Sequence, residues 1–319
     1  MAEALNLLDD RRAEPRRRAL ALLESLAEAR AGEATPRVGL TGTPGAGKST
    51  LLDGLVRALR ARGQTVGILA VDPSSQRSGG ALLGDRFRVR SGAGDPGVFL
   101  RSMAARDHLG GLADGAWAVL TVLSAVFDRV FVETVGVGQS ESEAANLVDT
   151  LVFVAQPGAG DVLQFMKAGV LELPDLFVVN KADLGAVAER TVHELSAGLG
   201  LAGTLRDGWP LRVLSASARD GTGIDALLTA LDDHFRHLTS GSGLRARRAR
   251  ACETLVLDGL SGRYGSYGLS ALGGRAALLE RVRQAGERAP FGLLDELARE
   301  IEEALRKPPD GPRREPRKP

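Results

Sequence analysis

The segment from Gly42 to Ser49 has the residue types and the spacing of a phosphate-binding loop. It reads Gly-Thr-Pro-Gly-Ala-Gly-Lys-Ser, which fits the pattern G-x-x-x-x-G-K-[ST], and it follows a short apolar run, Val38 to Thr41. Glycines let backbone N–H groups turn inward around phosphates, because other residues adopt the required conformations only at a steric cost. Lys48 supplies a charge to the β- and γ-phosphates, and the Ser49 hydroxyl supplies a ligand to Mg²⁺. The segment predicts nucleoside triphosphate binding through Gly45, Ala46, Gly47, Lys48, Ser49 and Thr50.

A second motif, Asn180-Lys181-Ala182-Asp183, follows an apolar run that begins at Leu176. A carboxylate at Asp183 can accept hydrogen bonds from the N1–H and the exocyclic amine of guanine, and adenine offers neither donor there. A site built for a specific hydrogen bond can reject the analogue that lacks it by roughly 10⁴ to 10⁵. The alternative is a strand-to-helix cap, in which Asp183 accepts local backbone N–H bonds. Ser215 and Ala216, after the last predicted strand, would complete a base pocket, although Ser/Ala turns are common.

Three carboxylates between these motifs are candidate Mg²⁺ ligands beside Ser49, because Mg²⁺ usually takes one or two carboxylates plus phosphate oxygens and waters. They are Asp72, Asp85 and Glu133. For Asp85 the alternative is an ordinary surface carboxylate. Gly136, three residues after Glu133, could present its N–H to the γ-phosphate, a contact that hydrolysis would remove. We therefore assign Lys48, Glu133 and Gly136 to triphosphate hydrolysis.

Short apolar runs alternate with helical patterns along most of the chain, which is typical of a parallel sheet with crossover helices. One such helix, Ser49 to Arg62, carries an apolar stripe and ends before Gly63. We expect an α/β P-loop NTPase fold with a mostly parallel sheet flanked by helices. The predicted strands are Val38 to Thr41, Val66 to Val71, Val130 to Glu133, Leu151 to Ala155, Leu176 to Asn180 and Leu211 to Leu214.

Both ends of the chain carry further helical patterns. We divide it into an N-terminal helical extension (1–35, with a helix from Ala13 to Arg30), a P-loop domain (36–238), a helical C-terminal arm (239–306) and a disordered tail (307–319). A linker or loop, 239–243, precedes a basic run, Arg245 to Arg250. One helical face between Phe291 and Leu305 must be buried, either on the P-loop domain or in a dimer seam. It contains Leu293, Leu294, Leu297, Ile301 and Leu305.

Composition excludes several classes of protein. The formal net charge is +1, so no global field attracts nucleic acid or an anionic membrane. The longest apolar stretch is shorter than the roughly 20 residues that span a bilayer. A single cysteine, Cys252, rules out internal disulfides and fits a cytoplasmic protein. His234 and His237 are three residues apart, which favours an exposed helical pair over a metal site.

Taken together, these motifs resemble the methylmalonyl-CoA mutase-associated GTPases, the MeaB/ArgK family of metallochaperone-like G proteins. The resemblance rests on GTPGAGKST (42–50), VDPSSQRSGGALLGDRFR (71–88), ETVGVGQSE (133–141), QPGAGD (156–161) and NKAD (180–183). It implies that the phosphate-loop, magnesium and guanine roles fall on the residues named above, with GTP or GDP bound and a homodimer formed through the C-terminal arm. It also implies a chaperone that protects an adenosylcobalamin-dependent acyl-CoA mutase and gates its cobalamin loading by GTP hydrolysis.

Two departures from the family pattern affect these expectations. Residues Val162 to Ala168, where the family has a mobile third switch, are more apolar than expected. This difference weakens the prediction that the protein is coupled to the usual mutase. The arm is rich in glycine between Gly259 and Gly274, where a longer helix is expected. Two other functions compete with the GTPase chaperone. They are a P-loop kinase that phosphorylates a small molecule or a transport protein, and a nickel-delivery GTPase, which would need Cys and His ligands.

Overall fold

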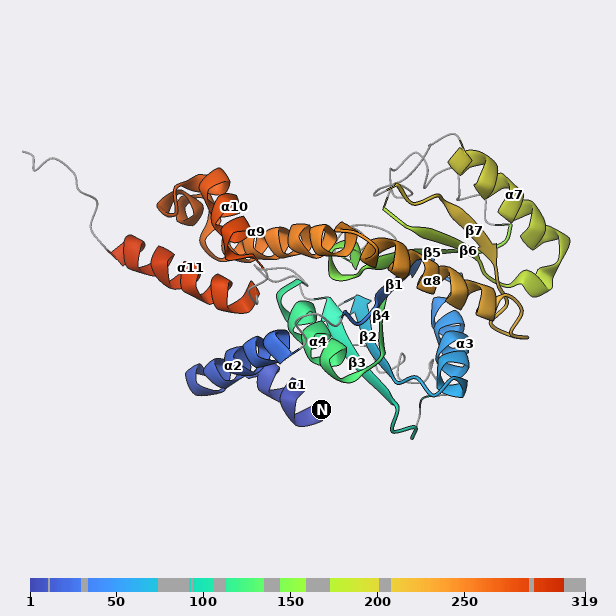
Figure 1. Cartoon of the computed structure of the whole chain (residues 1–319), viewed down its shortest axis with the longest axis horizontal. Coiled ribbons are helices and arrows are strands. Elements are labelled where there is room, and N and C mark those ends of the chain that lie inside the picture. The colour runs from blue at the N-terminus through green and yellow to red at the C-terminus, as the bar shows by residue number, and fades with distance from the viewer. Residues whose placement is uncertain are drawn as a thin grey trace, which may run out of the picture.

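Seven parallel strands form one sheet in the part of the chain that this computed structural model describes (Figure 1). The described residues are 1–10, 12–29, 34–73, 92, 94–105, 113–134, 144–158, 173–200, 208–286 and 290–306. The spatial order is β3-β2-β4-β1-β5-β6-β7, and every pair of neighbours is parallel. The strands are β1 (Arg37–Gly42), β2 (Val66–Pro73), β3 (Val98–Ala105), β4 (Arg129–Thr134), β5 (Thr150–Ala155), β6 (Leu176–Val179) and β7 (Arg212–Ser215). The α/β fold expected from the sequence is confirmed.

Six of these strands lie within one or two residues of the predicted runs, and β3 is the one that the sequence analysis missed. Among the described strands, β3 lies at an edge of the sheet and pairs with β2 alone. Its sequence, Val-Phe-Leu-Arg-Ser-Met-Ala-Ala, includes Arg101, whose guanidinium pairs with Asp9 of the first helix. An edge strand needs no continuous apolar run, because it has a neighbouring strand on one side only and its polar side chains can extend beyond the edge of the sheet.

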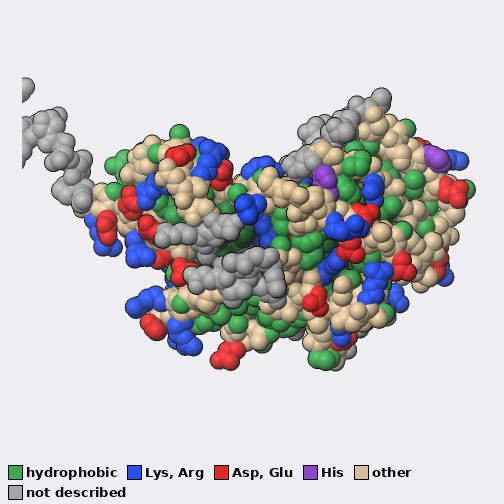
Figure 2. All heavy atoms as spheres, viewed as in Figure 1, with side chains coloured by type: hydrophobic (Ala, Val, Ile, Leu, Met, Phe, Trp, Pro, Cys, Tyr) green, Lys and Arg blue, Asp and Glu red, His purple; other side chains and the backbone are tan. Residues whose placement is uncertain are grey.

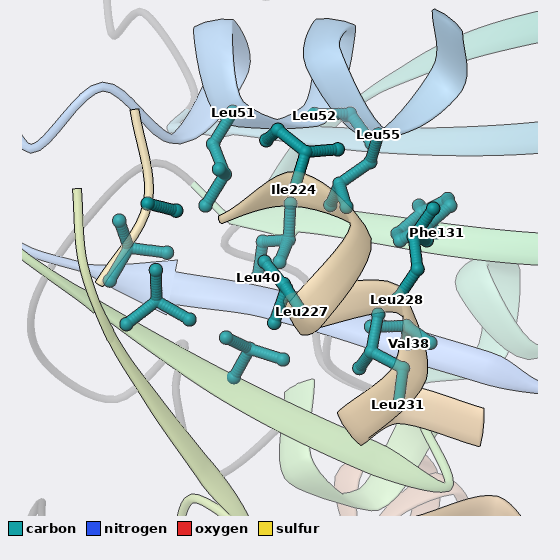
Figure 3. Close-up of a cluster of buried hydrophobic side chains, with 14 of the residues drawn as sticks. Val38, Leu40, Leu51, Leu52, Leu55, Phe131, Ile224, Leu227, Leu228 and Leu231 are labelled. Atoms are coloured by element: carbon teal, nitrogen blue, oxygen red, sulfur yellow. The ribbon is translucent and has the colours of Figure 1, made fainter. Parts of the chain in front are cut away.

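Helices cover both faces of the sheet, as the alternation of inward-facing side chains requires. On one face, α3 (Lys48–Ala61) and α8 (Ile224–Thr239) pack on Val38, Leu40 and Phe131 (Figure 3). Figure 3 shows three leucines of α3 pointing toward four apolar residues of α8. They are Leu51, Leu52 and Leu55, which face Ile224, Leu227, Leu228 and Leu231.

The residues that alternate with these in the strands point to the other face. There α4 (Ala113–Val126) packs on Leu69, Val130 and Leu151, and α7 (Ala186–Gly200) packs on Phe153 and Phe177. A 3₁₀ turn, η3 (Ala182–Leu184), leads from β6 into α7. The described part of the chain has no helix long and apolar enough to cross a membrane.

Two N-terminal helices pack against the sheet domain. They are α1 (Ala2–Asp9), which the sequence analysis did not predict, and α2 (Ala13–Ala29), which it did. Leu5 of α1 and Leu23 of α2 join the hydrophobic cluster around α4. Arg16 of α2 pairs with Asp295 near the C-terminus at 3.0 Å, so this arginine has a partner within its own chain.

Three C-terminal helices extend away from the sheet (Figure 1). They are α9 (Gly243–Ala271), α10 (Gly274–Ala285) and α11 (Pro290–Arg306), and α9 follows α8 after a break at residues 240–242. Within α9, Gly265 has non-helical dihedrals (φ 61°, ψ −167°) and divides it into two helical stretches. At Gly268 a Cβ would lie 2.2 Å from Cβ of Tyr264 and 3.3 Å from Cγ2 of Ile301. These two glycines therefore serve a bend and a close helix contact.

The leucine face of α11 is buried within the arm itself and not on the P-loop domain, which was one of the two alternatives drawn from the sequence. Leu293, Leu294, Leu297 and Ile301 pack on α9 and α10 of the same chain, in a cluster with Val256, Leu260 and Leu278. The homodimer expected through this arm stays a prediction. Leu305, at the end of this face, is exposed. The residues of the predicted disordered tail, 307–319, lie outside the described residues.

Charged side chains of both signs are interspersed on the face that Figure 2 shows. This distribution agrees with the balance of 41 basic and 40 acidic residues in the sequence. Specific recognition must therefore depend on a local site.

Candidate nucleotide-binding site

The phosphate-binding motif forms the loop between β1 and α3. β1 ends at Gly42 and α3 begins at Lys48, with Gly47 as an N-cap that offers no side chain to the first helical N–H groups. Gly42 has φ 134°, and a Cβ there would lie 2.1 Å from the carbonyl oxygen of Val154 in β5. Gly47 has φ 85°, and a Cβ there would lie 2.6 Å from Nδ2 of Asn180. Only glycine fits these two positions, and the uncapped start of α3 is suited to an anion.

Lys48 and Ser49 lie at the bottom of this loop and are buried. The Lys48 ammonium donates to the carbonyl oxygens of Gly42 (2.7 Å) and Thr43 (3.1 Å). The Ser49 hydroxyl donates to Oε1 of Glu133, at the end of β4, at 2.5 Å. Glu133 is 8% exposed. The structure thus brings together two of the predicted magnesium ligands, one from α3 and one from the neighbouring strand.

The Ser49–Glu133 pair has the donor chemistry that Mg²⁺ requires. Both groups offer hard oxygen atoms, and Mg²⁺ commonly takes only one or two carboxylates, completing its shell with phosphate oxygens and waters. In the described residues no three His, Cys, Asp or Glu side chains are close enough to hold a metal ion by themselves. The backbone of Asp72 lies at the end of β2, which neighbours β4, whereas Asp85 and Gly136 fall outside the described residues.

The guanine motif is hydrogen-bonded directly to the phosphate loop. Asn180 is 1% exposed, and its Nδ2 donates to the carbonyl oxygens of Ala46 (2.9 Å) and Gly47 (3.2 Å). Lys181 donates from Nζ to the carbonyl oxygen of Gly45 at 2.9 Å, and its own backbone is left-handed (φ 59°). Side chains that follow β6 therefore bind three consecutive carbonyls of the loop that follows β1. A displacement of either motif would therefore lengthen or break its hydrogen bonds to the other.

Asp183 stands at the outer end of this arrangement. Its Oδ1 accepts a hydrogen bond from the Ser217 hydroxyl at 3.0 Å, and its Oδ2 lies 3.7 Å from Nη1 of Arg219. The carboxylate is thus oriented by side chains of a neighbouring loop, an arrangement that the helix-cap alternative does not require. Its side chain is 22% exposed, so it can still meet a ligand.

Ser215 and Ala216, the predicted remainder of the base pocket, lie at the end of β7. Ser215 is exposed, and the Ala216 N–H donates to the carbonyl oxygen of Val179 at 2.9 Å, which continues the sheet. Ala216 also contacts the guanine motif, since its carbonyl accepts the Ala182 N–H at 3.0 Å, and further contacts come two residues after each predicted residue. Ser217 bonds Asp183, and the Ala218 N–H donates to Oδ1 of Asn180 at 3.4 Å. The sequence Ser-Ala-Ser-Ala contains two overlapping Ser-Ala pairs, so the pattern alone could not identify the second.

Two other polar groups beside the phosphate loop were missed. Oε1 of Gln156, the residue after β5, lies 3.3 Å from the position that a Cβ on Gly45 would occupy. The hydroxyl of Thr43 is buried without a hydrogen-bond partner among the described residues. No sequence signal distinguishes this threonine, but Gln156 opens a motif, QPGAGD, that the family resemblance had singled out.

The histidine pair on α8 corrects the expectation of an exposed pair. His234 is fully buried, and its Nδ1 lies 2.8 Å from the Thr150 hydroxyl. Its Nε2 lies 3.5 Å from a carboxylate oxygen of Asp175, and its ring contacts Trp209 edge-on. Burial lowers the pKa of His234 to about 4. Burial, reinforced by Glu253, raises the pKa of the Cys252 thiol to about 11, which makes it a poor nucleophile and metal ligand.

Comparison with known proteins now identifies the family. The family model described as methylmalonyl-CoA mutase-associated GTPase MeaB matches residues 1–263. The chain belongs to this family. A putative GTPase of Pyrococcus abyssi is 41% identical over 269 residues, which cover 83% of this chain and 82% of that protein. The GTPase ArgK of Escherichia coli is 38% identical over 253 residues, covering 78% and 75%.

A solved structure has a similar fold over nearly the whole chain. The crystal structure of a LAO/AO transport system kinase superposes with a TM-score of 0.64 at 27% identity, covering 93% of this chain and 92% of that one. The protein is therefore a P-loop GTPase.

Proposed function

We propose that this mutase-associated GTPase binds GTP with Mg²⁺ between its phosphate loop and its guanine motif, and uses hydrolysis to regulate a partner enzyme. The partner is an adenosylcobalamin-dependent acyl-CoA mutase of the methylmalonyl-CoA mutase type. The GTPase acts as its chaperone, protecting the mutase and gating its cobalamin loading. The family description supports the mutase association.

One observation carries the nucleotide assignment: Asn180 and Lys181 bind the phosphate-loop carbonyls while Asp183 keeps a partly exposed carboxylate beside them. A nucleotide held by Lys48 through its phosphates would extend toward Asp183 with its base. Ser217 positions the carboxylate, and we add Ser217 and Ala218 to the predicted pocket residues Ser215 and Ala216. Asp183 then accepts the N1–H and the amine of guanine, which adenine cannot supply.

The magnesium site consists of Ser49 and Glu133, with Asp72 and Asp85 as further candidate ligands. When bound there, Mg²⁺ neutralises charge on the β- and γ-phosphate oxygens. Glu133 and Ser49 already share a hydrogen bond, so the two oxygens are held at one place before a cation arrives. This preorganisation favours a cation that keeps several waters and phosphate ligands.

Hydrolysis is an in-line attack of water on the γ-phosphate, and this chain contributes mainly charge and position. Lys48 stabilises the phosphate oxygens as charge develops, and Gly136 offers its N–H to the γ-phosphate. No residue in the described part of the site stands out as a water-orienting base. We therefore expect slow intrinsic turnover that the partner accelerates, by ordering the loops or by supplying an arginine, a device worth about 10³ to 10⁵ elsewhere.

A substitution of Asp183 tests the base assignment. Asp183→Asn should weaken GTP binding by at least a hundredfold and allow xanthosine triphosphate to bind, because its C2 carbonyl can accept from the new amide. Asp225→Asn is the matched control, since Asp225 is an 83% exposed aspartate at the start of α8. Calorimetric titration with both nucleotides gives the result. Unchanged GTP affinity in Asp183→Asn refutes the assignment.

The partner assignment has its own test. GTP turnover is measured with and without each acyl-CoA mutase of the same organism, and the proposal requires acceleration by one of them. Equal turnover in all cases contradicts the chaperone function. Gel filtration of the same protein gives its apparent molecular mass, which tests the homodimer that the family resemblance implies. The cytoplasmic location stays a prediction from composition.

The kinase alternative has support in the name of one similar solved structure, a transport system kinase. The guanine motif speaks against it, because most such kinases use ATP. A nucleotide panel distinguishes them, since a kinase would prefer ATP and transfer phosphate to an acceptor other than water. The nickel-delivery alternative needs cysteine and histidine ligands, but His234 is committed to Thr150 in the core and Cys252 packs among the apolar residues of the arm.

A further inference from the structure

Two aspartates make the same contacts at the beginnings of neighbouring strands. Asp149 precedes β5, and its Oδ2 accepts the Arg37 N–H at 3.0 Å while its own N–H donates to the Arg37 carbonyl at 2.9 Å. Asp175 precedes β6 and makes the equivalent pair with Leu151, at 2.8 Å in both directions. Each carboxylate thus extends the ladder between two parallel strands by one further hydrogen bond.

Two consecutive arginines of α9 bind these aspartates. Arg247 donates from both terminal nitrogens to the two carboxylate oxygens of Asp175, each at 2.9 Å, and also to the backbone carbonyl of Asp149. Arg248 donates to both oxygens of Asp149 at 2.9 and 2.7 Å, and to the carbonyl of Thr35. The side chains of Arg247, Asp175 and Asp149 are at most 8% exposed, and that of Arg248 is 31% exposed. We call these four residues the strand-start clamp.

The three strands that the strand-start clamp holds are those that lead to the nucleotide site. β1, β5 and β6 are adjacent in the sheet and run in the same direction. Their carboxyl ends lead to the phosphate loop, to Gln156 and to Asn180. A forked guanidinium–carboxylate pair is geometrically specific, and two such pairs on one rigid helix define how far each strand start lies from its neighbour.

We infer that Arg247 and Arg248 are positioning residues for nucleotide binding, acting from the opposite edge of the sheet. They fix the offset between β1 and β6, and so the separation of the phosphate loop from the guanine motif. A nucleotide binds both motifs at once, so an error in that separation reduces binding of the whole nucleotide more than binding of its phosphates. This inference rests on the proposed assignment of Asp183 to guanine.

The test uses Arg248, because its partial exposure makes its variants easier to fold. Arg248→Met removes the fork and keeps an apolar stem, and Arg248→Lys keeps the charge without the fork. Arg283→Met is the matched control, since Arg283 of α10 pairs with Glu253 of α9 at 3.0 Å and that ion pair lies within the arm. Dissociation constants are measured for GDP and for inorganic pyrophosphate in the full-length protein, well below the melting temperature.

Arg248→Met should raise the dissociation constant for GDP about tenfold, less than the roughly hundredfold that a misplacement near 1 Å can cost in reaction rate. The constant for pyrophosphate should change less than about twofold, and Arg283→Met should change neither. Arg248→Lys should also weaken GDP binding more than pyrophosphate binding, by a smaller factor. This variant provides the test if Arg248→Met does not fold. Equal weakening of GDP and pyrophosphate, or a lowered melting temperature with unchanged GDP affinity, overturns the inference. Failure of the guanine assignment itself is visible separately, in the response of Asp183→Asn to xanthosine triphosphate.

Discussion

At the carboxyl edge of the sheet, the amino and amide groups of three side chains bind loop carbonyls, whereas at the amino edge two arginines form forked ion pairs with aspartates. Lys48, Asn180 and Lys181 donate to carbonyls of the segment from Gly42 to Gly47. At the other edge, Arg247 and Arg248 are paired with Asp175 and Asp149. The strands β1 and β6 therefore end in loops joined by hydrogen bonds to backbone carbonyls, whereas β5 and β6 are preceded by aspartates held in ion pairs.

This difference separates two uses of buried charge. A charge held by backbone carbonyls can turn toward a ligand, since it gives up little when an anion replaces these neutral partners. A forked pair between buried groups cannot, because breaking it leaves an uncompensated charge in a low dielectric. Substitutions at the carboxyl edge should therefore weaken binding with little loss of stability, whereas substitutions at the amino edge should lower stability as well as nucleotide affinity.

The largest effect is expected for Lys48→Ala, a change at the carboxyl edge. It should weaken GTP binding about a hundredfold, because hydrogen bonds to charged groups contribute about 1.5–3 kcal/mol each. The free energy of unfolding without nucleotide should fall by only about 1 kcal/mol, the net contribution of an ordinary hydrogen bond. Titration calorimetry and urea unfolding measure the two quantities on the same sample.

Arg62→Ala, at the other end of α3, serves as the control for Lys48. Arg62 pairs with Asp225 at the surface, and its removal should affect neither GTP binding nor stability appreciably. Loss of several kcal/mol of stability in Lys48→Ala would contradict the comparison, because it would make Lys48 a folding residue like those of the amino edge.

The carboxyl edge could be predicted from the sequence because its groups are local. The phosphate loop and the guanine motif each occupy a few consecutive residues, and each directly follows a strand whose apolar run is plain. Ser217 shows the limit of such patterns, since only its burial and its bond to Asp183, which the sequence does not reveal, distinguish it from Ser215. The edge strand β3 was missed because it has a neighbouring strand on one side only, so its sequence contains both polar and apolar residues.

The amino edge could not be predicted, because its partners are distant in sequence. Arg247 and Asp175 are 72 positions apart, and Arg248 and Asp149 are 99 positions apart. In the sequence the two arginines belong to a basic run, Arg245 to Arg250, that has the composition of a solvated helix face. His234 was expected at the surface for the same reason, since its burial depends on Thr150 and Asp175 and on no neighbour in the sequence.

The next largest effect should appear at the amino edge, as a pH dependence of folding caused by His234. Its folded-state pKa is lowered by burial to about 4, from an ordinary value of 6.5, although Asp175 and Asp149 oppose the shift and Arg247 and His237 reinforce it. The unfolded chain therefore binds a proton between pH 6.5 and 4 that the folded chain does not. Stability should fall as the pH falls through this window, by up to about 1.4 kcal/mol per pH unit from this group.

His234→Asn isolates this contribution, because an amide can accept the Thr150 hydroxyl bond without titrating. Urea unfolding at pH 7 and pH 5 should show that the wild type loses about 2 kcal/mol more than the variant between the two conditions. His237→Asn is the control for the change of residue type on α8. An identical pH dependence in wild type and His234→Asn would show that this edge does not depend on the neutral histidine.

The smallest effect is expected for an ion pair of the arm that lacks the burial of the strand-start clamp. Arg281 of α10 and Glu300 of α11 form two hydrogen bonds, with side chains that are 34% and 48% exposed. A double-mutant cycle with Arg281→Ala and Glu300→Ala should give a coupling energy of about 0.2–1 kcal/mol, because solvent and side-chain entropy offset most of the attraction. The coupling should decrease further in about 1 M salt, where exposed charges are screened within about 3 Å. A coupling energy above about 2 kcal/mol that persists in salt would mean that forked geometry alone, without burial, makes an ion pair strong. The contrast between the buried ion pairs of the amino edge and the exposed pairs of the surface would then be contradicted.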